Sequence, residues 1–477
     1  MRETVEGRVS RVIRLPPPPN GFYPSPPCGT IWSQAPASRA VLNLTGRKPL
    51  SQKIGSVMPT YFFQLGHCPD LSHAELIAAG SRMPGRLDQV QRIGEAAIGE
   101  CPSLEAVRSL CAELGGTIRA CECVTRREGA ETLQAETLTG ALAEMQADTW
   151  LIERSKRPVF GLSLLGSNED AGAVRRGHAV LHDTASWLKE RLREKGVSSR
   201  FVLPDPANHA ACLGGAQVEK NRMLEEGAEF CFYAPPGQGL LIGRTVWLQD
   251  YETYSKLDYG RPGRDARSGM LPPKLARMLI NLARTAETAS VLDPFCGGGG
   301  ILTEAALLGL SATGFDTSEK AVHDALRNWD WLQKQPPTPA GDVRVQSGDA
   351  RTLHTLCEPL YFDACVTEPY LGPPQKRPLS REAFEKLAGQ LVPLYLRALG
   401  EIRTVVKPGG RVVFIAPRFR LAGEEKIAAL PLFSEIKLQG YTVLDPLAGF
   451  TPVTGRKTLI YSRPKQYVQR EIFVLQA

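Results

Sequence analysis

The sequence lacks several features that would place it in a class at once. No apolar run approaches the roughly 20 residues that a membrane-spanning helix needs. The 11 cysteines are scattered, include no Cys-x-x-Cys pair and show no Cys/His spacing typical of zinc. No Lys follows the Gly-rich run at 297–300, as a phosphate-binding P-loop would require. We therefore expect no membrane span, no metal site, reduced cysteines and a cytoplasmic location.

Acidic residues are almost missing from residues 1–57. This segment holds eight Lys and Arg against Glu3 and Glu6, so it carries +6 of the net charge of +7. It is rich in Pro and cannot bury a core, which predicts a disordered extension. Three interpretations stay open: a nonfunctional extension from an upstream start codon, a basic arm touching RNA, and an organelle-targeting peptide. Residues 58–477 are near neutral, so overall charge gives no argument for nucleic-acid binding.

The length of 477 residues and the apolar content of 43% indicate two or three folded domains. Residues 58–150 are predicted to form a small α/β domain, in which the spacing of Ser72 and Glu75 matches a helix-opening capping box. Residues 151–250 form a second block of strands and helices. Residues 251–273 are predicted to be a linker with a Gly- and Pro-shaped loop.

A cluster of basic residues lies in the second block. Its members are Arg154, Lys156, Arg157, Arg175 and Arg176. Acidic residues interleave with the basic ones in the helix that follows, so a solvated charged face and an RNA-binding surface are about equally favoured by this pattern alone.

Residues 274–477 alternate between strand and helix patterns, which predicts a doubly wound, parallel α/β domain. The run from Val291 to Ala306 reads as an apolar strand ending in Asp293, a glycine turn at 297–300 and an apolar helix. This is the pattern of the first βα turn of such a sheet, where nucleotide-like ligands bind.

Three further predicted strands also end in acidic residues, which are Asp316, Asp349 and Glu368. Because the carboxyl ends of parallel strands meet at one edge of a sheet, all four carboxylates should face one crevice. Asp293 beside the turn would repel a pyrophosphate but suits the ammonium group of a cationic ligand. Asp316 can accept hydrogen bonds from ribose hydroxyls and Asp349 from an adenine amine. The pattern suits S-adenosylmethionine.

The turn after the fourth strand is suited to a methyl acceptor. The carboxylate of Glu368 and a backbone carbonyl stiffened by Pro369 could accept the two N–H bonds of an exocyclic amine, which would localise its lone pair. Tyr370 could stack on the base. No covalent nucleophile is needed, and we expect Cys296 and Cys365 to be packing residues.

These residues resemble a known family. The Asp293–Gly299 pattern, Asp316, Asp349 and the acidic-Pro turn at Glu368 are similar to the RNA methylases that make N2-methylguanosine. More narrowly, the chain resembles the THUMP-containing tRNA guanine-N2 methyltransferases of the position-10 guanosine type. Residues 58–150 are similar to their N-terminal ferredoxin-like domain and residues 151–250 to a THUMP domain.

The resemblance implies a Rossmann-like methyltransferase domain over residues 274–477 that uses S-adenosylmethionine. It also implies that the THUMP-like domain grips tRNA through the basic cluster and presents a flipped guanine. A small activator protein is required by some relatives. The residues expected at the cofactor are Asp293, Pro294, Phe295, Cys296, Gly297, Gly299, Asp316, Asp349 and Ala350. The catalytic residues expected are Glu368, Pro369 and Tyr370.

Two departures from the family pattern bear on activity. The family's first loop usually reads DPFCGSGT, whereas Gly298 and Gly300 replace the Ser and Thr here. The family's TDPPYG turn becomes Thr-Glu-Pro-Tyr-Leu-Gly at 367–372, so the carboxylate is one methylene longer and the aromatic moves by one residue. Two alternatives to a tRNA methyltransferase therefore stay open: an RNA-binding protein that binds S-adenosylmethionine without transferring its methyl, and an N-methyltransferase for another RNA or for DNA.

Overall fold

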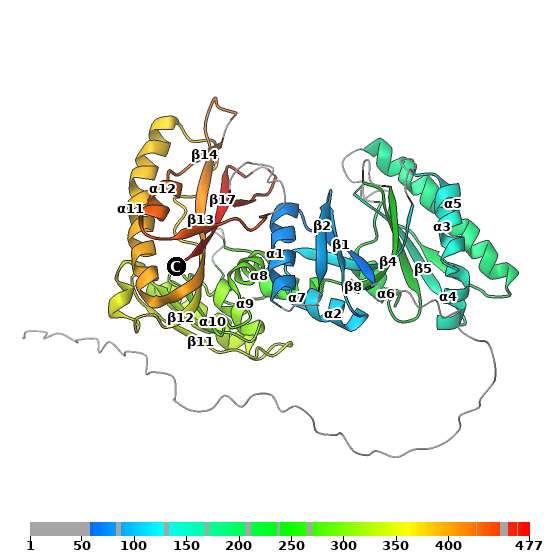
Figure 1. The fold of residues 1–477 in the computed structure, drawn as a ribbon, viewed down its shortest axis with the longest axis horizontal. Coiled ribbons are helices and arrows are strands. Elements are labelled where there is room, and N and C mark those ends of the chain that lie inside the picture. Colours follow the sequence, from blue (N-terminus) through cyan, green and yellow to red (C-terminus); the bar gives the residue numbers. More distant parts are fainter. Residues whose placement is uncertain are drawn as a thin grey trace, which may run out of the picture. The chain divides into compact units, whose positions relative to one another are not determined.

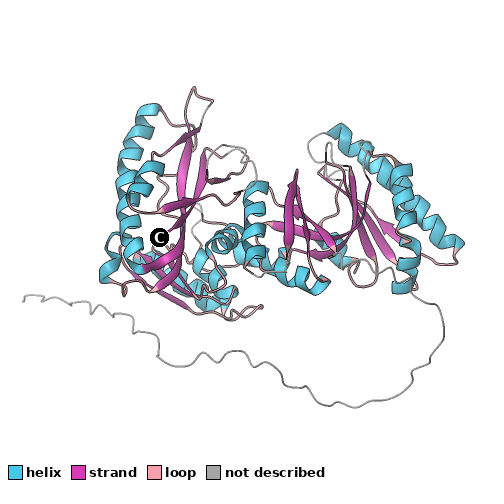
Figure 2. Cartoon of the chain, viewed as in Figure 1, coloured by secondary structure: helices cyan, strands magenta, loops and turns pink. Residues whose placement is uncertain are grey.

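The computed structural model describes residues 58–477 except 83–86, 128–132, 167–170, 206–210, 236–238, 265–269, 426, 449–456 and 465. The extension predicted at residues 1–57 lies outside the described residues. The described chain forms two sheets with helices packed on them (Figures 1 and 2).

The first sheet is built from residues 58–250. Its strands, in the order β2-β3-β1-β4-β8-β7-β5-β6, are β1 (Thr60–Leu65), β2 (Asp88–Ile93), β3 (Ala96–Glu100), β4 (Thr117–Arg127), β5 (Val159–Leu165), β6 (Arg200–Val202), β7 (Ala228–Tyr233) and β8 (Leu240–Leu248). Its helices are α1 (Pro69–Ser81), α2 (Leu104–Ala112), α3 (Ala135–Glu144), α4 (Ala147–Arg154), α5 (Ala171–Glu194) and α6 (Gly215–Lys220).

The two blocks predicted at residues 58–150 and 151–250 share this sheet. Strand β4 of the first block pairs antiparallel with β8 of the second, from Arg119↔Leu248 to Arg127↔Leu240. The fully buried guanidinium of Arg119 forms an ion pair with Glu229 on β7. Ser163 and Thr245 donate further hydrogen bonds to Glu229, each at 2.6 Å. The boundary at residue 150 stays a prediction, but backbone pairing runs across it.

The predicted capping box at Ser72 and Glu75 is wrong. Helix α1 begins at Pro69 with Cys68 as its N-cap residue, so Ser72 lies inside the helix and donates to the carbonyl of Cys68 at 3.1 Å. Glu75 is instead fully buried and accepts hydrogen bonds from the backbone N–H groups of Gly115 and Gly116 at 2.8 and 2.7 Å. The two residues that match the capping-box spacing therefore form their hydrogen bonds with other groups than a capping box would use.

The predicted linker contains a helix, α7 (Tyr251–Tyr259). The side chain of Asp250 caps it by accepting from the backbone N–H of Thr253 at 2.9 Å. The glycines and prolines that suggested a loop begin only at Gly260, directly after the helix ends.

The second sheet confirms the predicted α/β alternation. It is parallel from β11 to β13, but the predicted parallel order is wrong beyond β13, because β17 pairs antiparallel with β13 and β15. Its path runs β11-β10-β9-β12-β13-β17-β15, with β14 on β13 and β16 on β17. The strands are β9 (Ser290–Asp293), β10 (Ser311–Asp316), β11 (Val343–Ser347), β12 (Phe362–Thr367), β13 (Val406–Arg420), β14 (Ile427–Ala429), β15 (Thr442–Leu444), β16 (Leu459–Tyr461) and β17 (Val468–Gln476). The helices are α8 (Pro273–Ala283), α9 (Gly300–Leu307), α10 (Glu319–Leu332), the 3-10 helix η2 (Ala350–Thr355), α11 (Arg381–Val405) and α12 (Phe433–Leu438).

Successive apolar side chains along a strand pack on opposite faces of this sheet. On β9, Val291 packs with the core under α8 and α9, whereas Leu292 packs with the core under α11. The two layers of helices are visible on either side of β12 and β13 (Figure 1). Burial on both faces explains why these strands read as short, continuous apolar runs. No helix in the described part of the chain is long and apolar enough to span a membrane.

Replacing Glu75 by Ala should lower the free energy of unfolding by about 3 kcal/mol, because two buried N–H groups and Asn281 would lose their acceptor. Urea unfolding followed by circular dichroism measures this change. Glu105→Ala, at an exposed position on α2, is the matched control and should change stability by less than about 0.5 kcal/mol. Equal midpoints for the two variants would contradict a structural role for Glu75.

Candidate active site

The sheet order brings the four predicted strand ends together. Strands β11, β10, β9 and β12 are consecutive neighbours and all run parallel. Asp293 and Asp316 are the last residues of β9 and β10, Glu368 follows β12, and Asp349 follows β11 by two residues. The sheet topology therefore brings the four strand ends to one edge, as predicted.

Asp293 lies at the centre of this edge. Its side chain is fully buried, and Oδ1 accepts hydrogen bonds from the Phe295 backbone N–H at 3.2 Å and from Thr367 Oγ1 at 2.7 Å. Among the described residues, none donates to Oδ2. Burial raises the pKa of Asp293 to about 7, against these two hydrogen bonds, and the charges of Asp316 and Glu368 add to the rise.

The glycine turn has the geometry that its sequence predicts. Gly297 and Gly299 have φ values of +49° and +77°, which favour glycine. Asp316 holds the turn from the neighbouring strand, since its Oδ2 accepts from the Gly297 N–H at 3.0 Å. Pro294 and Cys296 are buried and Phe295 is half-buried. Burial raises the pKa of Cys296, in agreement with its prediction as a packing residue.

Asp349 is already engaged within the protein. It caps η2 by accepting from the Arg351 backbone N–H at 2.9 Å, and the Arg351 guanidinium binds both of its oxygens, at 2.6 to 3.0 Å. Hydrogen bonding from Arg351 lowers the pKa of Asp349. Ala350 beside it is buried. A role for Asp349 in binding adenine stays a prediction and would require Arg351 to share this carboxylate.

The turn after β12 is held by two residues that sequence reasoning missed. The Arg470 guanidinium on β17 donates from Nε to Glu368 Oε1 at 2.6 Å and from Nη2 to Oε2 at 3.4 Å. Tyr395 on α11 donates its hydroxyl to the Tyr370 carbonyl at 2.6 Å. The Tyr370 ring itself is 58% exposed and is free to contact a ligand.

A second missed pair of residues lies on the other side of the glycine turn. Asn328 on α10 accepts from the Gly263 N–H at 2.7 Å and donates to the carbonyls of Gly263 and Gly298, at 2.9 and 2.8 Å. It thereby ties the segment after α7 to the turn. Arg261 in that segment is 6% exposed, and no described residue forms a hydrogen bond with its Nε or Nη2.

The residues of the predicted basic cluster lie on both sides of β5 in the chain. Arg154, Lys156 and Arg157 precede β5, whereas Arg175 and Arg176 lie near the start of α5, beyond the other end of that strand. All five side chains are exposed. Arg154 donates to the carbonyls of Leu224 and Glu225, and its guanidinium lies 4.6 Å from the ring centre of Trp150. Their contact with RNA stays a prediction.

A doubly wound sheet with helices on both faces, and with carboxylates at the ends of four neighbouring strands, defines a Rossmann-like ligand-binding domain. Residues 261–418 match the family described as "RMKL-like, methyltransferase domain". The match covers about a third of the chain.

Several known proteins are similar to the chain. The tRNA (guanine(10)-N2)-dimethyltransferase of Pyrococcus abyssi is 33% identical over 147 residues, which are 31% of this chain and 39% of that protein. The protein of the same name from Methanothermobacter thermautotrophicus is 35% identical over 151 residues, 32% of this chain and 40% of that protein. The chain thus spans about two fifths of the length of these relatives.

Two solved structures are also similar over most of the chain. TrmN from Thermus thermophilus is 18% identical, with 87% of this chain and 99% of that chain covered and a TM-score of 0.48. SMU.472 in complex with SAH is 13% identical, with coverages of 87% and 97% and a TM-score of 0.45.

The residues present fit S-adenosylmethionine, the cofactor of this class. Two nitrogens of the buried Arg261 side chain have no hydrogen-bond partner among the described residues, and its Nη1 would lie 3.4 Å from a Cβ on Gly300, the first residue of α9. A bound anion would stabilise a buried cation beside the positive end of a helix. The α-carboxylate of S-adenosylmethionine would pair with Arg261, and Asp293 Oδ2 would accept a hydrogen bond from the α-ammonium group.

Cofactor affinity should depend on pH through Asp293. Only the ionised carboxylate attracts an ammonium group, and its pKa is raised to about 7 by burial, so protonation competes with binding below that pH. The Kd for S-adenosylhomocysteine should rise about tenfold for each pH unit below about 7. Calorimetric titration at several pH values measures this. The Asp293→Asn variant should bind S-adenosylhomocysteine weakly, with a Kd that does not change with pH. Asp330→Asn, at an exposed position on α10, is the control and should keep the pH dependence of the Kd.

Replacing Arg261 by Met should weaken S-adenosylhomocysteine binding at least about tenfold, as expected for losing a charge-assisted hydrogen bond. The matched ligand is 5′-methylthioadenosine, which lacks the carboxylate and the ammonium group and should bind the variant as it binds the unchanged protein. Parallel calorimetric titrations compare the two ligands. A similar loss for both would show that Arg261 shapes the turn instead of binding the carboxylate.

Proposed function

We propose that this protein transfers a methyl group from S-adenosylmethionine to the exocyclic N2 amine of a guanosine in tRNA. One observation carries the proposal: Thr367 and Glu368 are consecutive, Thr367 holds Asp293 at the expected cofactor site, and Glu368 begins the turn that would meet the acceptor. The names of the two relatives describe that reaction for those proteins and support the same assignment.

The turn can orient an amine without forming a covalent bond to it. Each Glu368 oxygen keeps a lone pair beyond the one given to Arg470, so the carboxylate can still accept an N–H bond. The Pro369 carbonyl can accept the second N–H bond. Tyr370 offers an exposed ring for stacking on a base. When bound, S-adenosylmethionine supplies the methyl group, and the amine proton displaced by it passes to Glu368 or to water.

Arg470 explains how a longer side chain can serve at this position. Glutamate has one more rotatable bond than aspartate and would lose more conformational freedom on being fixed. The Arg470 contact at 2.6 Å fixes the carboxylate from outside the turn. The same contact motivates the second candidate function, in which neutralisation of Glu368 leaves an RNA-binding protein that holds the cofactor without transferring its methyl.

The remaining parts of the proposal concern partners. We propose that residues 151–250 act as a THUMP-like RNA-binding domain through Arg154, Lys156 and Arg157 before β5 and Arg175 and Arg176 on α5. A cytoplasmic location and a small activator protein belong to the same proposal. Binding of tRNA in competition with duplex DNA and other structured RNA distinguishes the substrate classes.

Incubation of the full chain with labelled S-adenosylmethionine and unmodified tRNA tests the reaction. Glu368→Gln should lower methyl transfer at least about a hundredfold, since it removes the acidic acceptor of the amine, and should leave the Kd for S-adenosylhomocysteine unchanged. Glu368→Asp keeps the charge and should retain most of the activity lost by the Gln variant. Unchanged turnover in Glu368→Gln would refute this role. Cofactor binding by the unchanged protein without any labelled RNA would instead favour the second candidate.

A further inference from the structure

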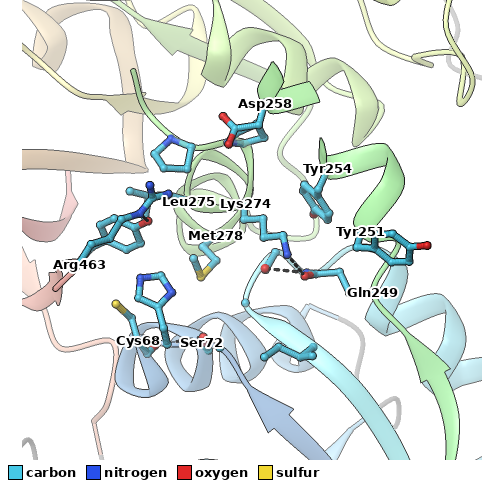
Figure 3. A pocket seen from close by; sticks show the side chains of 18 of the residues that line it. Cys68, Ser72, Gln249, Tyr251, Tyr254, Asp258, Lys274, Leu275, Met278 and Arg463 are labelled. Atoms are coloured by element: carbon cyan, nitrogen blue, oxygen red, sulfur yellow. Dashed lines mark hydrogen bonds between the residues drawn. The ribbon is translucent and has the colours of Figure 1, made fainter. Parts of the chain in front are cut away.

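The structure contains a pocket whose lining includes none of the four strand-end carboxylates. Helices α1, α7 and α8 and the segment that follows β16 surround it, and its volume is about 610 Å³. Cys68 and Ser72 enter from α1, Lys274 enters from α8, and Arg463 lies opposite Gln249 (Figure 3). We call this space the junction pocket. Its volume is within the range of about 300–1,000 Å³ typical of sites for small organic groups.

Two cations converge on the junction pocket. Lys274 donates to Gln249 Oε1 at 2.5 Å and Arg463 donates to the Tyr461 hydroxyl at 3.0 Å, so both have neutral partners. Within the described ranges, neither forms an ion pair with a carboxylate. Burial lowers the pKa of His67 between them, and the charges of Arg463 and Lys274 lower it further. Burial also lowers the pKa of Lys274, although Asp258 opposes this. Asp258 also lines the pocket, so its lining holds two cations and one carboxylate, and the net positive charge favours an anionic group.

Aromatic side chains form much of the remaining wall. Tyr251 and Tyr259, at the two ends of α7, are 38% and 66% exposed, and Tyr254 lies between them. The Lys274 ammonium lies 5.1 Å from the Tyr254 ring centre. Exposed aromatic faces beside cations are what single-stranded nucleic acid needs, since bases stack on the rings and phosphates meet the charges.

One side chain joins the junction pocket to the proposed catalytic turn. Tyr461 lines the pocket, and its ring packs edge-on against His67 with centres 5.1 Å apart. The guanidinium carbon of Arg470 lies 5.9 Å from the same ring, and Arg470 binds Glu368. Two side chains, Tyr461 and Arg470, therefore connect a group in the pocket to the carboxylate that would meet the methyl acceptor.

We propose that the junction pocket binds a nucleotide of the RNA substrate that flanks the methylated one. Its phosphate would lie between Lys274 and Arg463, and its base would stack on one of the exposed tyrosines at the ends of α7, Tyr251 or Tyr259. This inference rests on the proposed function, because it takes the turn at Glu368 as the place of the methylated base. The pocket would add affinity for RNA without touching the cofactor.

Steady-state kinetics and ultraviolet crosslinking on the full chain test the inference. Arg463→Gln and the double variant Tyr251→Leu, Tyr259→Leu should each raise the KM for unmodified tRNA about tenfold, as expected for losing one phosphate or stacking contact. Their kcat and their Kd for S-adenosylhomocysteine should change less than twofold. Arg344→Gln at the start of β11 and Phe433→Leu on α12 are matched exposed controls and should leave KM unchanged.

Mass spectrometry of the crosslinked protein should find nucleotide adducts on peptides that contain residues 251–259 or 461–463. Unchanged KM values together with adducts only elsewhere would overturn the pocket while leaving the methyltransferase assignment intact. Adducts in the pocket of a protein that methylates no RNA would support the pocket and sink the proposed reaction. Free GMP or AMP that binds the pocket as tightly as tRNA does would also overturn the inference, because the site would then serve a free nucleotide.

Discussion

The buried carboxylate of Asp293 is the interaction on which the site depends. It joins three segments, since it ends β9, accepts from the backbone of the glycine turn at Phe295 and accepts from Thr367 on β12. A charge in this position is costly without partners, and burial raises its pKa to about 7. Because the ionised carboxylate is destabilised by burial, binding of a cation beside it is favoured. The same carboxylate thus positions the turn, aligns the fourth strand with it and creates the demand for a ligand.

The parts that could be predicted from the sequence are those whose signals are local. The apolar run, the glycines and the helix after Asp293 follow one another along the chain, and the edge position of all four acidic residues follows from parallel strands. Helix α7 was missed because Gly260 and Pro262 directly after it dominated the pattern. The Ser72 and Glu75 pair was misread because the spacing of a capping box does not report burial.

Contacts between distant residues could not be predicted in this way. Arg470 meets Glu368 across 102 positions, and nothing in the spacing of β17 distinguishes this arginine from others that face solvent. Arg261 stands within the predicted linker, but its burial and the lack of a described hydrogen-bond partner for two of its nitrogens are properties of the folded chain. Both residues supply charge to the site from outside the motifs, which is why motif reading found the carboxylates and missed their counterparts.

The two departures from the family pattern are different in kind. Glycines at 298 and 300 remove side chains, and the turn is held by backbone contacts to Asp316 and Asn328 that need no hydroxyl there. The change to Glu368 alters the length of a functional group, so it requires a compensating contact. Arg470 provides one, and because Arg470 also faces Tyr461, the compensation couples the acceptor turn to the junction pocket. The longer carboxylate at this turn therefore makes the site depend on β17.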